Sequence, residues 1–234
     1  MQNLITTLFI DLDGTLYDRN NGMMQEMSQR IARYMETTMH LPSAEIPGLI
    51  NRYYSTYGST LYGIQQEHDI DTQEYLAYIH DLDLDNYLSP SPSLQALLTA
   101  LPQRKWIFTN SDHNHATRVL TKLGILDQFE GILDVWSMEY IPKPHPWVYQ
   151  HALEMAGDPD AEECMFIDDS LRNLPPAKQA GMATVLISND MNTSFEHFTI
   201  SKIKELPTVL AMVENERILQ QIFNTIAIDQ PVTI

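Results

Sequence analysis

The chain has 234 residues, of which 44% are hydrophobic and 19% charged, which fits an ordinary globular protein with one large domain, or a core domain with a smaller insert. Its formal net charge of -17 disfavours a nucleic-acid-binding surface, because such a surface must neutralise phosphates with Lys and Arg. A single cysteine excludes an internal disulfide framework, and no apolar run has the length of a membrane span or the pattern of a signal peptide. We therefore expect a cytoplasmic protein that acts on neither membranes nor nucleic-acid polymers; a monomer is plausible, and the oligomeric state is left open.

Short apolar runs, each typical of a buried strand, recur along the chain at residues 5–10, 105–109, 131–135, 164–167 and 183–187. Helical patterns separate the later runs, at 116–126 and 174–181, and each ends near a glycine. Strands that alternate with helices predict a parallel sheet covered by helices on both faces, which is a Rossmann-like α/β fold. Residues beyond about 206 indicate one terminal helix and a tail.

The interval between the first two runs does not follow this alternation, since it is far longer than one crossover helix needs. Apolar residues recur there every four positions, at Met23, Met27, Ile31 and Met35, and we interpret this stripe as packing inside a helical unit. A Pro/Ser segment closes the interval. We expect a helical insert, or cap, at 19–88 on an α/β core made of 1–18 and 89–234.

Polar residues follow four of the predicted strands, at the point where each strand ends. They are Asp11 and Asp13 in LFIDLDGTLYD, Thr109 and Asn110 in IFTNSD, Lys143 in IPKPHP, and Asp168 and Asp169 in MFIDDS. The carboxyl ends of parallel strands meet at one edge of a sheet, where ligands bind, so these side chains should converge. Taken singly, each motif also fits an exposed turn, a helix N-cap or a surface lysine; their joint occurrence favours a site.

The residue types at this edge indicate the chemistry. Several carboxylates suit a hard cation such as Mg²⁺, which takes one or two of them together with water and phosphate. Lys143 and the start of the helix after Thr109 are positive features that suit a phosphate. The sequence therefore predicts a magnesium-dependent site for a phosphoryl group.

The ordered motifs D-x-D-G-T, T-N, K-P and D-D-S resemble those of the haloacid-dehalogenase-like phosphohydrolase superfamily, over about residues 1–190. The resemblance implies that Asp11 is a nucleophile that forms an aspartyl-phosphate, and that Asp13 is the general acid and base. It implies that Thr109 and Lys143 bind phosphate. It further implies a magnesium site made by Asp11, Asp169 and the main-chain carbonyl of Asp13, with Asp168 in support.

One position departs from the family pattern. Asn173 lies where many relatives carry a second acid, four residues after the Asp of the last motif that is implied to bind metal. An amide can still orient a metal-bound water, but it carries no charge. We expect a slightly weaker magnesium affinity, not a lost function.

The insert carries the indication of substrate. The stretch YYSTYGSTLYGIQQEHDIDTQEY, residues 53–75, resembles the cap of the pyrimidine 5′-nucleotidase branch, which implies a nucleoside monophosphate such as UMP or CMP as substrate. Within it, YGSTLYG at 57–63 is expected to form a shaped loop whose Ser59 and Thr60 face the site and read the base and sugar. Asn110 is a further candidate for substrate binding. The other tyrosines are expected to pack inside the cap.

Other interpretations remain open. The same site would suit a sugar phosphate or phosphoglycolate. A receiver domain also gathers acids, Thr and Lys, but in a different order along the chain, and a non-catalytic binding module would be expected to lack Asp11 or Asp13. His113 and His115 form an H-N-H triplet that could serve metal or nuclease chemistry; we expect them to cap and pack a helix instead.

Overall fold

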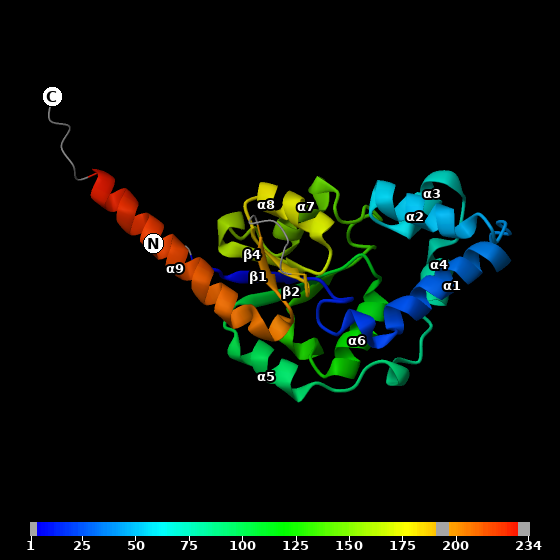
Figure 1. Ribbon diagram of the computed structural model, residues 1–234, viewed down its shortest axis with the longest axis horizontal. Helices are drawn as coiled ribbons and strands as arrows, with labels where there is room; N and C mark the ends of the chain where they lie inside the picture. The colour runs from blue at the N-terminus through cyan, green and yellow to red at the C-terminus, as the bar shows by residue number, and fades with distance from the viewer. Residues whose placement is uncertain (1–3, 191–196, 229–234) are drawn as a thin grey trace, which may run out of the picture.

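A parallel sheet forms the centre of the computed structural model, which describes residues 4–190 and 197–228, with side chains described as far as residue 219. Its strands lie in the order β3-β2-β1-β4-β5-β6. They are β1 (Thr7–Ile10), β2 (Arg104–Phe108), β3 (Gly131–Leu133), β4 (Cys164–Asp168), β5 (Ala183–Ile187) and β6 (Phe198–Ile200). Figure 1 labels the central strands β2, β1 and β4. The predicted α/β fold and its five strands are confirmed. The edge strand β6 was not predicted, because three residues are too few to show a periodic pattern.

Helices cover both faces of the sheet. Successive side chains of a strand point to opposite sides, so both faces are apolar and must be covered. Leu8 and Ile10 pack on one face with α5 (Pro92–Ala100), α6 (His113–Leu123) and the start of α9 (Leu206–Ile228). Phe9 packs on the other face with α7 (Pro146–Met155) and α8 (Leu174–Gln179). Strands β1 to β5 thus each contribute to two hydrophobic cores, which explains why they read as continuous apolar runs.

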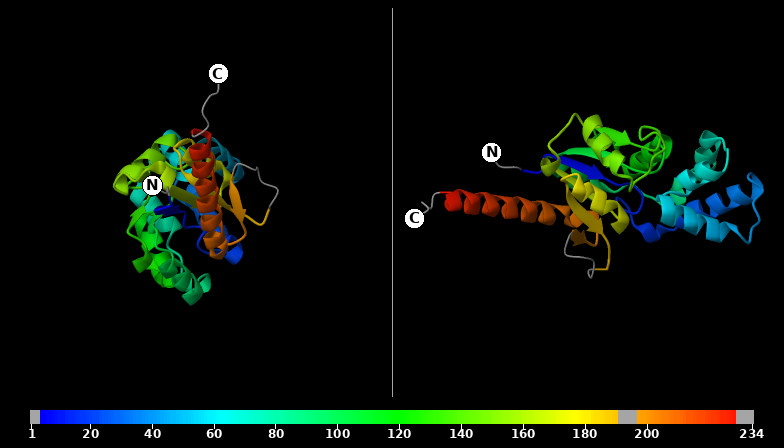
Figure 2. Two further views of the ribbon diagram at one scale, coloured as in Figure 1. Left: turned by 90° about the vertical axis from the view of Figure 1, so that its left-hand side faces the viewer. Right: turned by 90° about the horizontal axis from the view of Figure 1, so that it is seen from above.

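Four helices follow β1 and gather at one end of the molecule, with α9 projecting at the other (Figures 1 and 2). They are α1 (Met23–Thr37), α2 (Ile46–Tyr57), α3 (Thr60–Glu67) and α4 (Thr72–Ile79). Buried tyrosines hold them together: Tyr34 and Tyr75 meet edge to face, with ring centroids 5.1 Å apart. Most of the tyrosines in this region therefore pack, as expected.

The methionine stripe of α1 is divided between two cores. Met35 packs among the four helices, as predicted. Met23 and Met27 instead pack with Leu12, beyond the end of β1, in the core on one face of the sheet. The expectation that the whole stripe packs inside the insert was wrong, because the first turns of α1 lie directly over the sheet edge.

Short 3-10 turns connect the main elements: η1 (Arg19–Asn21), η2 (Leu84–Asn86), η3 (Leu126–Gln128), η4 (Ala161–Glu163), η5 (Leu171–Asn173) and η6 (Ile203–Glu205). Within the described ranges, no helix combines the length and the apolar composition that crossing a bilayer requires.

Candidate active site

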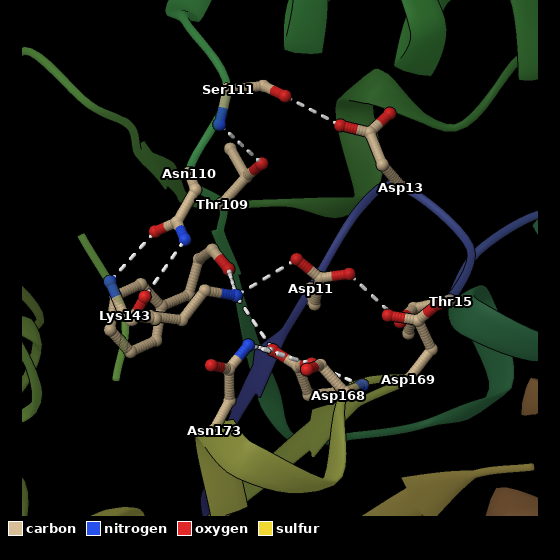
Figure 3. A network of polar contacts seen from close by, with 12 residues as sticks. Asp11, Asp13, Thr15, Thr109, Asn110, Ser111, Lys143, Asp168, Asp169 and Asn173 are labelled. Atoms are coloured by element: carbon tan, nitrogen blue, oxygen red, sulfur yellow. Dashed lines mark hydrogen bonds and ion pairs between the residues drawn. The ribbon is translucent and has the colours of Figure 1, made fainter. Parts of the chain in front are cut away.

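The site lies where the sheet reverses its order. From β1 the chain builds β2 and β3 on one side, and β4 to β6 lie on the other. Such a reversal opens a crevice at the carboxyl ends of the strands, where α/β folds bind ligands. Asp11 follows β1 at this point, with its main-chain N–H donating to the carbonyl of Ile167, 2.9 Å away, and Asp168 ends β4. The predicted convergence is thus present (Figure 3).

Lys143 occupies the centre of the site, although it comes from a distant loop. Its Nζ lies 2.9 Å from Oδ1 of Asp11, 2.8 Å from Oδ2 of Asp168 and 2.5 Å from the carbonyl oxygen of Phe108. Only 1% of the residue is exposed. Burial opposes its charge, but the two carboxylates outweigh burial and raise the pKa of Lys143. A permanently charged ammonium is therefore fixed between two acids.

Asn110 and Thr109 shape the loop around this lysine. The Asn110 side chain accepts from the main-chain N–H of Lys143 at 2.9 Å and donates to its carbonyl oxygen at 3.1 Å. The Thr109 hydroxyl accepts from the main-chain N–H of Ser111 at 3.0 Å. Asn110 thus uses both ends of its amide to hold Lys143, and its predicted contact with substrate stays a prediction, as does the phosphate contact of Thr109.

Three carboxylates could hold a metal ion. Oxygens of Asp11, Asp168 and Asp169 all lie within 4.8 Å of one another. Burial, and then the charge of Asp168, raises the pKa of Asp169 to about 6. Burial likewise raises the pKa of Asp11, which Lys143 opposes and Asp168 reinforces. Acids that repel one another in this way fit a cation, so the donor set suits the divalent ion expected from the sequence.

Gly14 and Arg19 adapt the loop after β1 to this cluster. Gly14 has φ +90°, and a Cβ there would lie 2.3 Å from Oδ2 of Asp169, so no larger residue fits without displacing the acid. The half-exposed Arg19 places Nη1 2.8 Å from the same oxygen. Arg19 is a partner of Asp169 that sequence reasoning missed.

Asn173 contacts Asp168. Its Nδ2 lies 3.1 Å and 3.0 Å from the two carboxylate oxygens of Asp168. Oδ1 of Asp168 also accepts from the main-chain N–H of Ser170 at 2.8 Å. Asp168 is thereby fixed facing Lys143, consistent with a supporting role. The amide at position 173 orients an acid here, and its effect on metal affinity stays a prediction.

The side chain of Asp13 points away from Asp11 and toward Ser111 (Figure 3). Three donors hold its carboxylate. Its Oδ2 accepts from Ser111 Oγ at 2.6 Å, and its Oδ1 accepts from Tyr17 OH at 2.6 Å and lies 2.9 Å from His115 Nε2. Burial alone would raise the pKa of Asp13, but His115, Ser111 and Tyr17 together lower it below its ordinary value. His115 packs, as expected, and also contacts the acid, which was not expected. His113 is exposed, and the N-cap of α6 is Asp112.

A cavity of about 510 Å³ joins this cluster to the inserted helices. Its floor contains the acids and Lys143, and its opposite wall contains Ser28, Asn51, Tyr54, Ser59 and Thr60 with apolar residues of α1 and α4. The predicted loop residues therefore do line the site. The loop itself is shorter than expected: Gly58 and Ser59 separate two helices, Thr60 begins α3, and Gly63 lies inside α3 against Tyr53.

Sequence reasoning did not find the hydroxyl groups that orient the acids. Thr15 Oγ1 donates to Oδ2 of Asp11 at 3.0 Å, and Tyr17 and Ser111 donate to Asp13. Thr15 and Tyr17 are four residues from the acids they contact, a spacing that one turn of helix-like chain brings together. That spacing was the available signal. Nothing in the sequence alone joins Ser111 to Asp13.

Several known proteins are similar to this chain. Phosphate metabolism protein 8 of Saccharomyces cerevisiae is 33% identical over 192 residues, which cover 76% of this chain and 60% of that protein. Glyceraldehyde 3-phosphate phosphatase of Pyrococcus abyssi is 25% identical over 233 residues, covering 91% of this chain and 95% of that one. Phosphoglycolate phosphatase of Neisseria gonorrhoeae is 33% identical over 114 residues, 47% of each chain. None of these three is named as a nucleotidase.

The fold has counterparts among solved structures. The putative HAD-hydrolase YfnB of Bacillus subtilis, solved bound to magnesium, superposes with a TM-score of 0.59 at 18% identity and covers 88% of this chain and 99% of that one. At that identity the likeness concerns the fold alone. The family model for the haloacid dehalogenase-like hydrolases matches residues 5–181, which is most of the chain and contains the site just described. The chain therefore belongs to the haloacid dehalogenase-like hydrolase family.

Proposed function

We propose that this protein is a magnesium-dependent phosphomonoester hydrolase that acts through an aspartyl-phosphate on Asp11. The observation that carries the proposal is the buried Lys143, whose Nζ lies 2.9 Å from Asp11 and 2.8 Å from Asp168. The ammonium already contacts Asp11, Asp168 and the carbonyl oxygen of Phe108, so it acts as a fixed positive charge beside the nucleophile, which attracts a phosphoryl group entering from the cavity side.

The proposed reaction has two displacements at phosphorus. The substrate enters as a monoanion and gives its phosphate proton to Asp13, which is ionised in the free protein because its pKa lies below the ordinary value. A carboxylate oxygen of Asp11 then attacks the phosphoryl group, the bond from phosphorus to the leaving oxygen breaks, and that oxygen takes the proton from Asp13. Water then attacks the same phosphorus, its proton returns to Asp13, and inorganic phosphate leaves with Asp11 restored. Thr15 and Lys143 hold Asp11 in place through both steps.

The metal would be held by Asp11 and Asp169, with the main-chain carbonyl of Asp13 and support from Asp168. Magnesium bound there supplies positive charge that stabilises the phosphoryl oxygens and offsets the repulsion between carboxylates. Without it, the cations that contact the three carboxylates, among the residues that the structure describes, are Lys143 and Arg19, which leaves a net charge of about minus one and disfavours an anionic substrate.

The preferred substrate class is a small organic phosphate such as a sugar phosphate or phosphoglycolate. This choice is supported by the activities named for the relatives from Pyrococcus abyssi and Neisseria gonorrhoeae. We treat 1–18 and 89–234 as the catalytic core and 19–88 as the cap that selects among such substrates.

A pyrimidine nucleoside monophosphate is the second candidate, and the cavity favours it. A volume of about 510 Å³ exceeds what a three-carbon phosphate fills. The wall opposite the acids offers neutral hydrogen-bonding groups at Asn51, Ser59 and Thr60, and the half-exposed ring of Tyr54. Such groups can pair with a base edge and a ribose, whereas a smaller substrate would leave them unpaired.

A phosphate-release panel tests both the reaction and the substrate. The purified protein is assayed with triose, pentose and hexose phosphates, phosphoglycolate, UMP, CMP and purine nucleotides, with Mg²⁺ or with EDTA. We expect release only with Mg²⁺, and the highest kcat/KM identifies the substrate class. Absence of release from every ester in the presence of Mg²⁺ would overturn the hydrolase in favour of a phosphate-binding or receiver-like module.

A further inference from the structure

One face of α6 clamps the end of the cap. Asp112, His115 and Arg118 are spaced three residues apart, so they lie along one side of the helix. Arg118 donates to the main-chain carbonyl of His80 at 2.8 Å and also to that of Leu82. Both carbonyls belong to the segment that leaves α4 and returns to the sheet. The last turn of the cap is therefore fixed against the helix that starts beside the active site.

His80 and His115 are stacked at this contact. Their ring centroids are 4.2 Å apart with 20° between the planes. His80 Nδ1 contacts Oδ2 of Asp112, while Oδ1 of Asp112 accepts from the main-chain N–H of His115 at 2.9 Å. All three side chains are buried. One carboxylate thus holds a histidine of the cap and the backbone of a histidine of the core in register.

His115 in turn contacts Asp13. Its Nε2 lies 2.9 Å from Oδ1 of Asp13, and an ionised carboxylate can only accept, so Nε2 is the nitrogen that carries the hydrogen. Its Nδ1 is buried and has no hydrogen-bond partner among the residues that the structure describes. An unpaired buried nitrogen is costly. A residue needed only for packing would be better replaced by an apolar one, so this cost indicates that the bond to Asp13 is the reason for a histidine at this position.

We propose that His115 is the positioning residue of Asp13, and that His80 makes this positioning depend on the seating of the cap. The proposal rests on the proposed role of Asp13 as the proton donor. A carboxylate held by Ser111, Tyr17 and His115 has one orientation relative to Asp11, and the His115 ring keeps that orientation only while His80 covers it. A displaced cap removes the stack and frees the ring. The cap then controls proton donation as well as access to the cavity.

The test compares two substrates whose leaving groups differ in whether they need a proton to depart. An alkyl phosphate needs a donor when its oxygen departs, whereas 4-nitrophenolate leaves unprotonated. The quantity compared is kcat/KM, which covers the steps up to leaving-group departure and excludes the later hydrolysis common to both substrates. The variants are His115→Leu, His115→Gln, which keeps a donor near the same place, and His80→Leu. His113→Leu is the matched control, an exposed histidine of the same helix.

We expect His115→Leu to lower kcat/KM for the alkyl phosphate by about 10- to 100-fold, part of the general-acid effect, while 4-nitrophenyl phosphate changes less than about threefold. His115→Gln should recover much of the loss, His80→Leu should show the same selectivity with a smaller loss, and His113→Leu should show none. An equal loss on both substrates in His115→Gln or His80→Leu would overturn the proposal, as would no loss in His80→Leu; these two variants remain informative if His115→Leu does not fold.

Asp13→Asn separates this inference from the proposed function. It should lower kcat/KM for the alkyl phosphate by roughly 10²- to 10⁴-fold and spare 4-nitrophenyl phosphate. If Asp13→Asn shows that selectivity and the histidine variants do not, the positioning role fails and the mechanism stands. If Asp13→Asn shows none, Asp13 is not the proton donor, and the inference fails with that part of the proposed function.

Discussion

The two walls of the active-site cavity are built from opposite kinds of chemistry. The wall at the sheet edge holds buried charges that are fixed by one another, with Lys143 between Asp11 and Asp168. The wall of the inserted helices is mostly neutral: apart from His80, which contacts Asp112, it presents hydroxyl, amide and aromatic groups among apolar side chains. We infer that the sheet wall sets the reaction and the cap wall sets the substrate. Changes to Asp11 or Lys143 on the first wall should affect every ester, and changes to the hydroxyl and amide groups of the second wall only some.

The largest expected loss of activity comes from removing the nucleophile on the sheet wall. Asp11→Asn keeps the size of the side chain but removes the attacking oxygen, so turnover of all phosphate esters should fall on the order of 10⁴-fold or more. Steady-state phosphate release measures this loss. Asp127→Asn, at an exposed acid outside the cavity, is the control and should be unaffected. Substantial turnover by Asp11→Asn would mean that water attacks the substrate directly.

Gly58 lies where the inserted helices approach the Lys143 loop of the sheet wall. Its φ is +86°, and a Cβ there would lie 2.5 Å from Cδ of Pro144 and 2.6 Å from the carbonyl oxygen of Lys143. Gly58→Ala should therefore press the cap away from the Lys143 loop and lower kcat/KM roughly 10- to 100-fold, as small misplacements in active sites do. The effect should appear with every substrate, because it displaces the catalytic lysine.

Gly157 provides a matched control for that substitution, since it also has φ +86° but no atom within 4 Å of a Cβ. Both alanine variants should lose about 1 to 2 kcal/mol of unfolding free energy from the left-handed backbone, measured by denaturant titration. Only Gly58→Ala should lose activity. Equal activity in the two variants would show that the close approach of Gly58 to the Lys143 loop is not needed for activity.

The pH dependence of metal binding should sharpen the account of the sheet wall. The pKa of Asp169 is raised from 3.8 to about 6, so below that pH a proton competes with the metal for this carboxylate. The half-saturating Mg²⁺ concentration should rise about tenfold for each pH unit below about 6. In the metal-free protein, the contribution of Asp169 to the free energy of unfolding is fully present below pH 3.8. It is lost as the pH rises through about 6. Activity titrated with Mg²⁺ at several pH values measures the first effect; a constant half-saturation point would contradict it.

The smallest expected effect belongs to the cap wall. Replacing Ser59 and Thr60 together with alanine removes two hydroxyls from the cavity, each worth about 1 kcal/mol or fivefold when it binds substrate. If the substrate is UMP or CMP, kcat/KM for these should fall while a small generic ester is hydrolysed as before. Because Ser59 also caps α3, thermal unfolding of the variant is measured alongside. An equal loss on both substrates would contradict the selective role.

The difference between the walls also explains what the sequence could predict. The acids and Lys143 each follow their own strand, and a parallel sheet brings strand ends together whatever the side-chain details, so that part of the site was predictable. The partners of Asp13 were not. Ser111 reaches it from the end of β2 and His115 from α6, and no spacing along the chain joins either residue to Asp13.

The cap was predictable in kind but less so in detail. Helical periodicity indicated the insert, yet the same stripe of methionines serves two cores, because a helix that starts over the sheet edge buries its first turns there. Glycine spacing suggested one open loop at 57–63. In the structure Gly58 ends α2 in a left-handed conformation, and Gly63 is a point of close helix packing. Glycine serves both purposes, and the sequence does not distinguish them.

Trapping the covalent intermediate tests the central claim most directly. Wild-type protein and the Asp13→Asn variant are quenched in acid while turning over 4-nitrophenyl phosphate with Mg²⁺, and borohydride then reduces any aspartyl-phosphate to homoserine. Peptide mass spectrometry should find homoserine at position 11, more of it in Asp13→Asn because hydrolysis of the intermediate is slowed, and none in Asp11→Asn. Continued turnover with position 11 unmodified, or modification at Asp169 instead, would contradict the assignment of Asp11 as the nucleophile.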